Sequence, residues 1–168
     1  MQILITLLLA VMMMAGLFLL LWGGVGFVQN KSFFSSAPKE VRDSVPDTKP
    51  ERFKGQHFVG WIMIVLAFAL MVGAVVIGAV LGVRDNLTFW QLSARFLVMI
   101  LLVKAFDIGF FDWFLLCNSG FGFFAGFYPE CKPVLGRYLF GYNWKTHLAH
   151  IIGAFPVSAL IAWICTLF

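Results

Sequence analysis

Three charged side chains lie inside the otherwise apolar stretch between Arg95 and Trp113: Lys104, Asp107 and Asp112. At about 100° per residue on an α-helix, the two aspartates fall roughly 60° and 80° to either side of the lysine, so all three share one face. Because an ionised group facing lipid is costly, this face should look into a helix bundle or a wet cavity. We therefore expect these three residues to be the catalytic groups of an intramembrane site. The alternative is that Lys104 and Asp107 form a pair that only neutralises itself.

Three histidines fall at the starts of other apolar segments. His57 precedes one such segment, whereas His147 and His150 lie three residues apart at the start of another, which places them on one helix face. Helical bundles build metal sites from such pairs when a carboxylate faces them from another helix. The sequence therefore predicts a metal site made of His57, Asp112, His147 and His150, suited to zinc or iron. The alternative is that the histidines are interfacial anchors without a ligand.

The composition fixes the class of protein that must position these groups. Of 168 residues, 61% are hydrophobic and only 12% are charged, which is typical of an integral membrane protein and not of a soluble domain. The net charge of +4 then relates to membrane orientation and lipid headgroups, and we expect no nucleic-acid partner.

Four apolar runs are long enough to cross a bilayer, which takes about 20 helical residues. We expect transmembrane helices at 3–28, 58–83, 89–111 or longer, and 148–168. The first run has no basic leader and exceeds the apolar core of a signal peptide, so we expect it to be retained. The predicted fold is a single all-α domain over residues 1–168, a compact up-down bundle of four transmembrane helices.

The basic residues predict the orientation of this bundle in the membrane. Nine of them fall in the first and third loops, against two, Arg84 and Arg95, on the other side. Lys and Arg are enriched in cytoplasmic loops. We therefore expect a multi-pass protein of the cell membrane with cytoplasmic loops at 29–56 and 117–146 and both termini outside. The predicted polar site then opens to the cytoplasmic side.

The two long loops differ in composition. Residues 29–56 are rich in proline and charge, which predicts a solvated linker with one short helical turn beginning at Pro38. The loop from Cys117 to Cys131 alternates glycines with aromatic residues and should lie at headgroup depth, either as a lid over the site or as an inert interfacial belt. In a reducing cytoplasm these two cysteines should be free thiols.

Small residues recur at four-residue spacing on two of the predicted helices. The second helix has Ala74, Gly78 and Gly82, and the fourth has Ala154, Ser158 and Ala162. Such stripes allow close helix contact. They predict contacts within the chain, or alternatively a homo-oligomer.

Three functions fit these features. The first is a membrane-embedded enzyme or binding protein that takes a lipid-like, amphipathic ligand from the bilayer. The second is a homo-oligomeric transporter or channel for a small solute or ion, in which Lys104 and Asp107 gate the path. The third is an accessory membrane subunit without chemistry. The sequence favours the first, and it resembles no family whose motifs we could quote.

Overall fold

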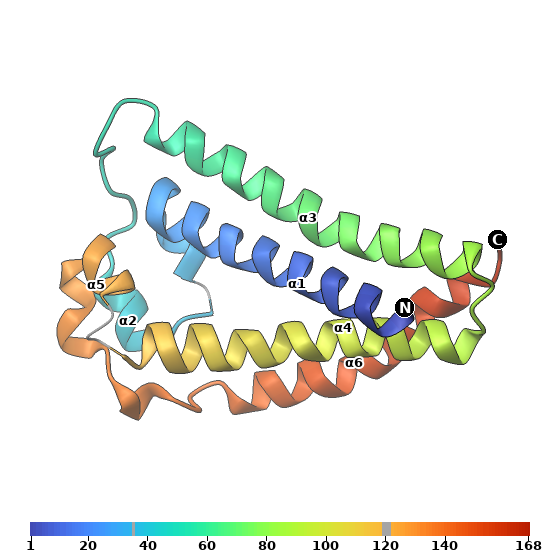
Figure 1. Cartoon of the computed structure of the whole chain (residues 1–168). Helices are drawn as coiled ribbons and strands as arrows, with labels where there is room; N and C mark the ends of the chain where they lie inside the picture. Colours follow the sequence, from blue (N-terminus) through green and yellow to red (C-terminus); the bar gives the residue numbers. More distant parts are fainter. Residues whose placement is uncertain (35, 119–121) are drawn as a thin grey trace.

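The computed structural model describes residues 1–34, 36–118 and 122–168, and these residues form helices and connecting loops with no strand among them (Figure 1). The long helices are α1 (Gln2–Leu21), α3 (Gln56–Arg84), α4 (Phe89–Phe106) and α6 (Trp144–Cys165). Two π-helices extend α1 and α4: η1 (Trp22–Val28) and η3 (Asp107–Leu116). The shorter elements are η2 (Lys31–Phe34), α2 (Lys39–Ser44), α5 (Phe123–Phe127), η4 (Pro129–Val134) and η5 (Arg137–Leu139).

Within the described residues, three helices are long and apolar enough to cross a membrane: Gln2–Val28, Gln56–Arg84 and Trp144–Cys165. The predicted helix that starts at residue 89 also forms, and it follows the longer of the two expected courses because η3 continues α4 to Leu116. Its start is set by a capping box, in which Thr88 and Gln91 each satisfy a backbone N–H of the other. The all-helical class is thus confirmed, with three candidate spans.

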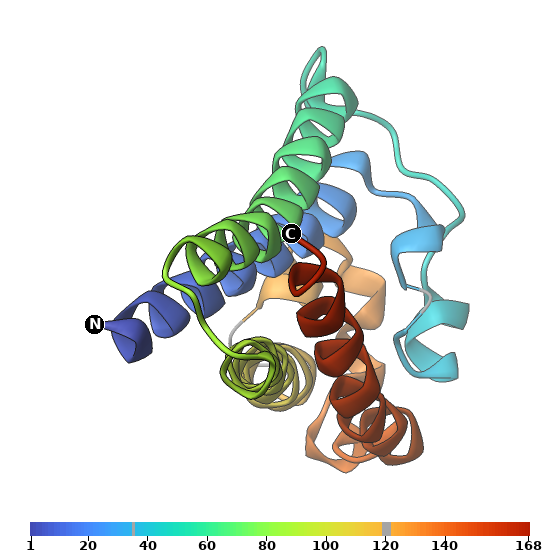
Figure 2. The same ribbon diagram turned by 90° about the vertical axis from the view of Figure 1, so that its right-hand side faces the viewer.

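The long helices alternate in direction, but they do not form a square bundle. Helices α1 and α4 pack against each other at the centre, α3 lies mainly on α1, and α6 lies mainly on α4 (Figures 1 and 2). The outer helices α3 and α6 approach each other near the chain termini and diverge toward the end that holds the long loops (Figure 2).

Small residues make the close crossings, as the four-residue spacing predicts. All six residues of the two stripes are buried within the single chain. A Cβ added to Gly78 would lie 3.2 Å from Leu9 Cδ1 and 3.3 Å from Phe96 Cε1. At Gly60 a Cβ would lie 2.8 Å from the backbone nitrogen of Val28. These glycines therefore let α3 approach α1, α4 and η1 directly.

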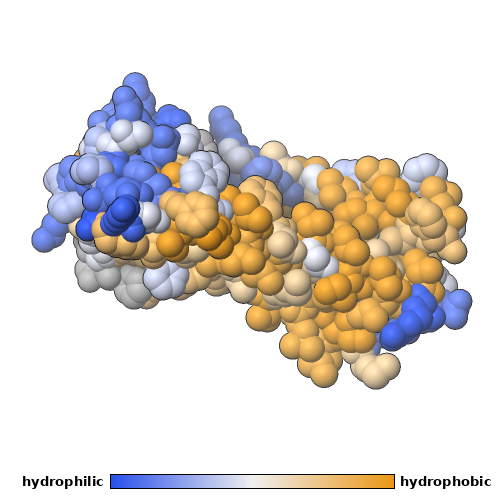
Figure 3. Space-filling model, turned by 90° about the horizontal axis from the view of Figure 1, so that it is seen from above, coloured by the Kyte–Doolittle hydropathy of each residue, from blue (hydrophilic) through white to orange (hydrophobic). Residues whose placement is uncertain are grey.

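The first long loop is not the solvated linker that its composition predicts. The turn after Pro38 does form, as α2, but Phe34, Val41 and Val45 are almost fully buried. They pack in one cluster with Tyr128 and other residues of the third loop. A few apolar residues spaced among the charged ones are enough to bury one side of the loop. The average composition of the loop does not reveal this spacing. The two loops together form a polar-surfaced cap on one end of an apolar body (Figure 3).

Candidate functional site

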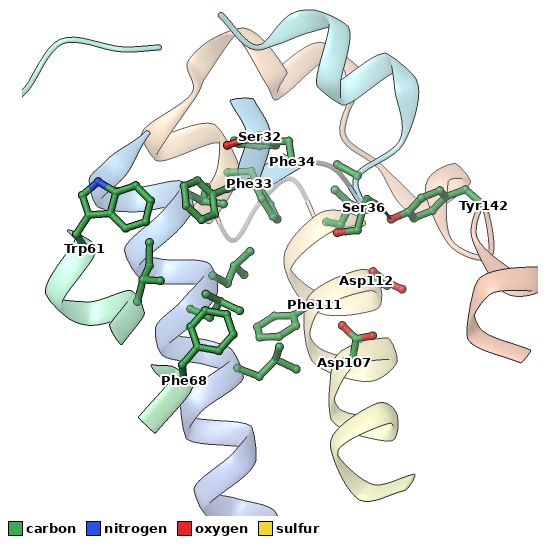
Figure 4. Close-up of a pocket in the computed structure, with 18 residues that line it drawn as sticks. Ser32, Phe33, Phe34, Ser36, Trp61, Phe68, Asp107, Phe111, Asp112 and Tyr142 are labelled. Carbon is green, nitrogen blue, oxygen red and sulfur yellow. Dashed lines mark hydrogen bonds between the residues drawn. The ribbon is translucent and has the colours of Figure 1, made fainter. Parts of the chain in front are cut away.

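The π-helix η3 brings the two predicted aspartates to the same side of the molecule. In a π-helix, the backbone hydrogen bond joins residues five apart, so Asp107 and Asp112 lie nearly one above the other. On the α-helix assumed from the sequence they would be about 140° apart. Both line a cavity of about 480 Å³, where their carboxylates lie next to one another (Figure 4). This volume is within the range of ligand pockets.

Asp112 is held by a second helix. Its Oδ2 lies 2.6 Å from His147 Nε2 and accepts a longer hydrogen bond of 3.4 Å from Asn143 Nδ2. Asp112 and His147 are each 9% exposed. Among the described residues, the Nδ1 atom of His147 is buried without a hydrogen-bond partner, and both side-chain contacts of Asp112 given above use its Oδ2. The histidine thus fixes one carboxylate oxygen and leaves the other for the cavity.

Asp107 is the second carboxylate at the polar end of the cavity. Its Oδ2 lies 2.6 Å from Lys104 Nζ, an i,i+3 ion pair on the α4–η3 helix. Lys104, Asp107 and His150 also line a second cavity of about 290 Å³. This cavity shares Leu17 and Asp107 with the first one. The two cavities are therefore neighbours that meet at Leu17 and Asp107, and we call the pair the groove.

The walls of the larger cavity are apolar, and part of them is open toward the outside of the bundle. Trp61 and Phe68 of α3 line it, and each is 53% exposed. Phe111 and Phe34 line its interior, and the first loop closes the end near the aspartates (Figure 4). A long apolar molecule could enter beside the exposed rings of Trp61 and Phe68 and place its polar end at Asp107.

Two residues of the site, Tyr142 and Asn143, were not predicted from the sequence. Tyr142 lines the cavity, and its hydroxyl donates a hydrogen bond to the backbone oxygen of Ser36. Burial, and then the neighbouring carboxylates, raise the pKa of Tyr142, so the phenol stays protonated. Asn143 lies four residues before His147, so it precedes the histidine by one helical turn. That spacing was the one signal in the sequence that could have identified Asn143.

The four predicted metal ligands do not come together. Among the described residues, no group of three or more His, Cys, Asp or Glu side chains could hold a metal ion. Asp112 and His147 meet, His150 lines the neighbouring cavity beside Lys104, and His57 lies instead near Glu51, with 3.8 Å between Nδ1 and Oε1. The spacing of His147 and His150 was consistent with a shared face, but only His147 is turned toward Asp112.

The third loop covers part of the site, although its residues 119–121 lie outside the described part of the chain. Phe124 of α5 lines the large cavity, which agrees with the predicted lid in this respect. Cys117 and Cys131, which bracket the loop, are free and buried, as expected.

No protein-family model, curated protein or solved structure matches this chain. The function must therefore be argued from the groove itself.

Proposed function

We propose that the chain is a four-span integral membrane protein that binds an amphipathic, lipid-like molecule in the groove, whose larger cavity is lined by α1, α3, η3 and the first loop. The observation that carries this proposal is the apolar cavity of about 480 Å³ whose polar end is formed by Asp107 and Asp112. The α4–η3 helix would be the fourth span. Its charged residues Lys104, Asp107 and Asp112 line the groove or pair with each other, which keeps them from facing lipid.

The polar end of the ligand should donate hydrogen bonds. Ionised carboxylates only accept them, and the side-chain contacts described for Asp107 and Asp112 all use the Oδ2 atom of each. Lys104 already neutralises Asp107, which leaves Asp112 beside an imidazole and an amide. An ammonium or a hydroxyl-rich head would fit this end, whereas a fatty-acid carboxylate would meet like charges.

The groove is complete in one copy of the chain. The small-residue stripes that might have joined two copies are buried within the chain by its own helices. This supports a binding protein over the homo-oligomeric transporter. The accessory-subunit alternative predicts no ligand in the groove, so the same binding experiment tests it.

The test compares ligands that share one alkyl chain and differ only in their head. The purified protein in detergent is mixed with dodecylamine, dodecanol or dodecanoic acid, and the thermal midpoint is measured at equal ligand concentration. We expect the amine to raise the midpoint most and the acid least, because only donors pair with Asp112. Equal shifts for all three would contradict a specific head site.

Variants locate the binding. Asp112→Asn should reduce the shift caused by the amine, since the variant loses the negative charge and keeps nearly the same shape. Asp85→Asn is the matched control, because Asp85 lies at the other end of the bundle, where it accepts a hydrogen bond from Gln2. An equal loss in both variants would show that the amine acts on the whole protein and not in the groove.

Catalysis on the bound molecule is a second candidate, favoured by the contact between Asp112 and His147. A carboxylate held by an imidazole can take a proton from a water molecule that attacks the carbonyl carbon of an ester, and return that proton to the alcohol as the C–O bond breaks. Incubation with hydroxyl-bearing lipid esters, followed by mass spectrometry of the products, tests this activity. His147→Gln should then retain ligand binding and lose turnover, whereas a parent that binds without forming product is a binding protein only.

A further inference from the structure

A buried arginine marks a second cavity at the opposite end of the bundle. Arg95 of α4 is only 4% exposed. Its Nη1 donates to the backbone oxygen of Gly78 at 2.8 Å, and its Nη2 donates to Gln2 Oε1. The guanidinium therefore links α4 to both α3 and α1.

No carboxylate pairs directly with Arg95 among the described residues. The nearest acid in the network is Asp85, but its Oδ2 accepts from Gln2 Nε2 at 2.9 Å and its Oδ1 accepts from Arg84 Nε at 3.2 Å. Two arginines and one aspartate leave this group with a net charge of +1. A guanidinium has five N–H donors, and the two bonds described above use two of them.

Arg95 also lines a cavity of about 310 Å³. Most of the lining is apolar, including Ile3 and Leu7 of α1 and Ala94 and Val98 of α4. The other polar lining residues already have hydrogen-bond partners. Gln2 donates to Asp85, and Gln91 accepts from the Thr88 backbone in the cap of α4. Thr6 donates to the backbone oxygen of Gln2. The polar group that this cavity offers to a ligand is thus the Arg95 guanidinium, which is cationic and donates hydrogen bonds.

We propose that this cavity binds the phosphate group of a membrane phospholipid, with the lipid chains along Leu7 and Val98. Arginine is well suited to phosphate because its planar fork can donate two parallel hydrogen bonds to two oxygens. The arginine lies about two helical turns from the start of α4, so if the α4–η3 helix spans the bilayer, Arg95 lies nearer to one membrane surface than to the bilayer centre. This site is separate from the groove near Asp112 and has the opposite charge.

Native mass spectrometry tests the proposal on the full chain. The detergent-solubilised protein is incubated with phosphatidylglycerol, with diacylglycerol of the same chains, or with inorganic phosphate, and bound mass and thermal midpoint are both recorded. We expect a bound phosphatidylglycerol and a raised midpoint, and neither with diacylglycerol. Inorganic phosphate producing the full shift would show that a soluble phosphate is the ligand and overturn the lipid as its source.

Variants separate the binding role of Arg95 from its role in linking helices. Arg95→Lys keeps the charge and loses the fork, so retained lipid should fall about tenfold. Ala94→Phe leaves every contact of Arg95 in place and fills the cavity, so it should also lose the lipid while folding normally. Ala105→Phe is the matched control, because Ala105 is also exposed on α4 and does not line this cavity. Full lipid retention in Ala94→Phe would overturn the proposal, even if Arg95→Lys failed to fold.

Discussion

Asp112 shows how far residue types and spacing could predict this site. The isolated carboxylate in an apolar helix and the histidine at the start of another helix were sufficient to place Asp112 near His147, and the two atoms lie 2.6 Å apart. The same reasoning failed for His57, because its partner, Glu51, lies in a loop whose path the sequence does not specify. Single polar residues in lipid-soluble helices are informative because few partners exist for them. Polar residues near loops have many possible partners.

A residue-scale prediction concerns the ion pair that ties the two loops together. Lys49 Nζ lies 2.8 Å from Glu130 Oε1 and also donates to the Phe127 backbone oxygen at 3.0 Å. Burial acts to raise the pKa of Glu130, but the pair with Lys49 outweighs it, so the pKa lies below its ordinary value. The pair therefore stabilises the cap above the pKa of the unfolded chain, about 4.3, and this stability is lost as the pH falls through the lower folded value.

Thermal melts of parent and Glu130→Gln between pH 3 and 7 check this sign. The variant should be less stable at neutral pH, by about 1 kcal/mol or less for a partly exposed pair, and the difference should vanish at acid pH. A variant whose deficit grows at low pH would contradict the assignment.

At the scale of elements, the helices were predictable and the relation between them was not. Continuous apolar runs gave the approximate bounds of α1, α3 and α6, because length and hydropathy alone decide a span. The π-helix η3 carries no comparable signal, and it changed which residues share a face. The buried side of the first loop was missed for a related reason, since Val41 and Val45 are buried in a cluster with residues distant in the sequence, such as Tyr128.

Two glycines provide an element-scale prediction. Gly60→Ala should destabilise the protein by about 1–3 kcal/mol, because the new Cβ would lie 2.8 Å from the backbone nitrogen of Val28, which cannot move aside as a side chain could. Gly153→Ala, in the interior of α6, meets nothing within 4 Å and should gain up to about 1 kcal/mol of helix propensity. Unfolding midpoints in detergent compare the two. Equal effects would show that the crossing at Gly60 is looser than described.

At the scale of the whole molecule, the charge bias predicts the orientation. Single cysteines at Thr48 and Leu167, both exposed, are introduced after replacing the three native cysteines. In intact cells, a membrane-impermeant maleimide should label position 167 and not position 48 until the membrane is permeabilised, because the bias of nine basic residues predicts that the capped end is cytoplasmic. Labelling of position 48 from outside would reverse the orientation and place the groove at the outer face.

The divergence of α3 from α6 also has a mechanical consequence. The bundle is narrow near the termini and broad at the capped end (Figure 1). A body of this outline takes up unequal cross-sectional areas in the two leaflets once it is embedded in a bilayer. Lateral pressure from the lipids on its broad half would press α3 against the cavity that Trp61 and Phe68 line, and relief of that pressure would let α3 move outward. The width of the groove should therefore respond to bilayer tension and to lipid shape, without any change in the residues that line it.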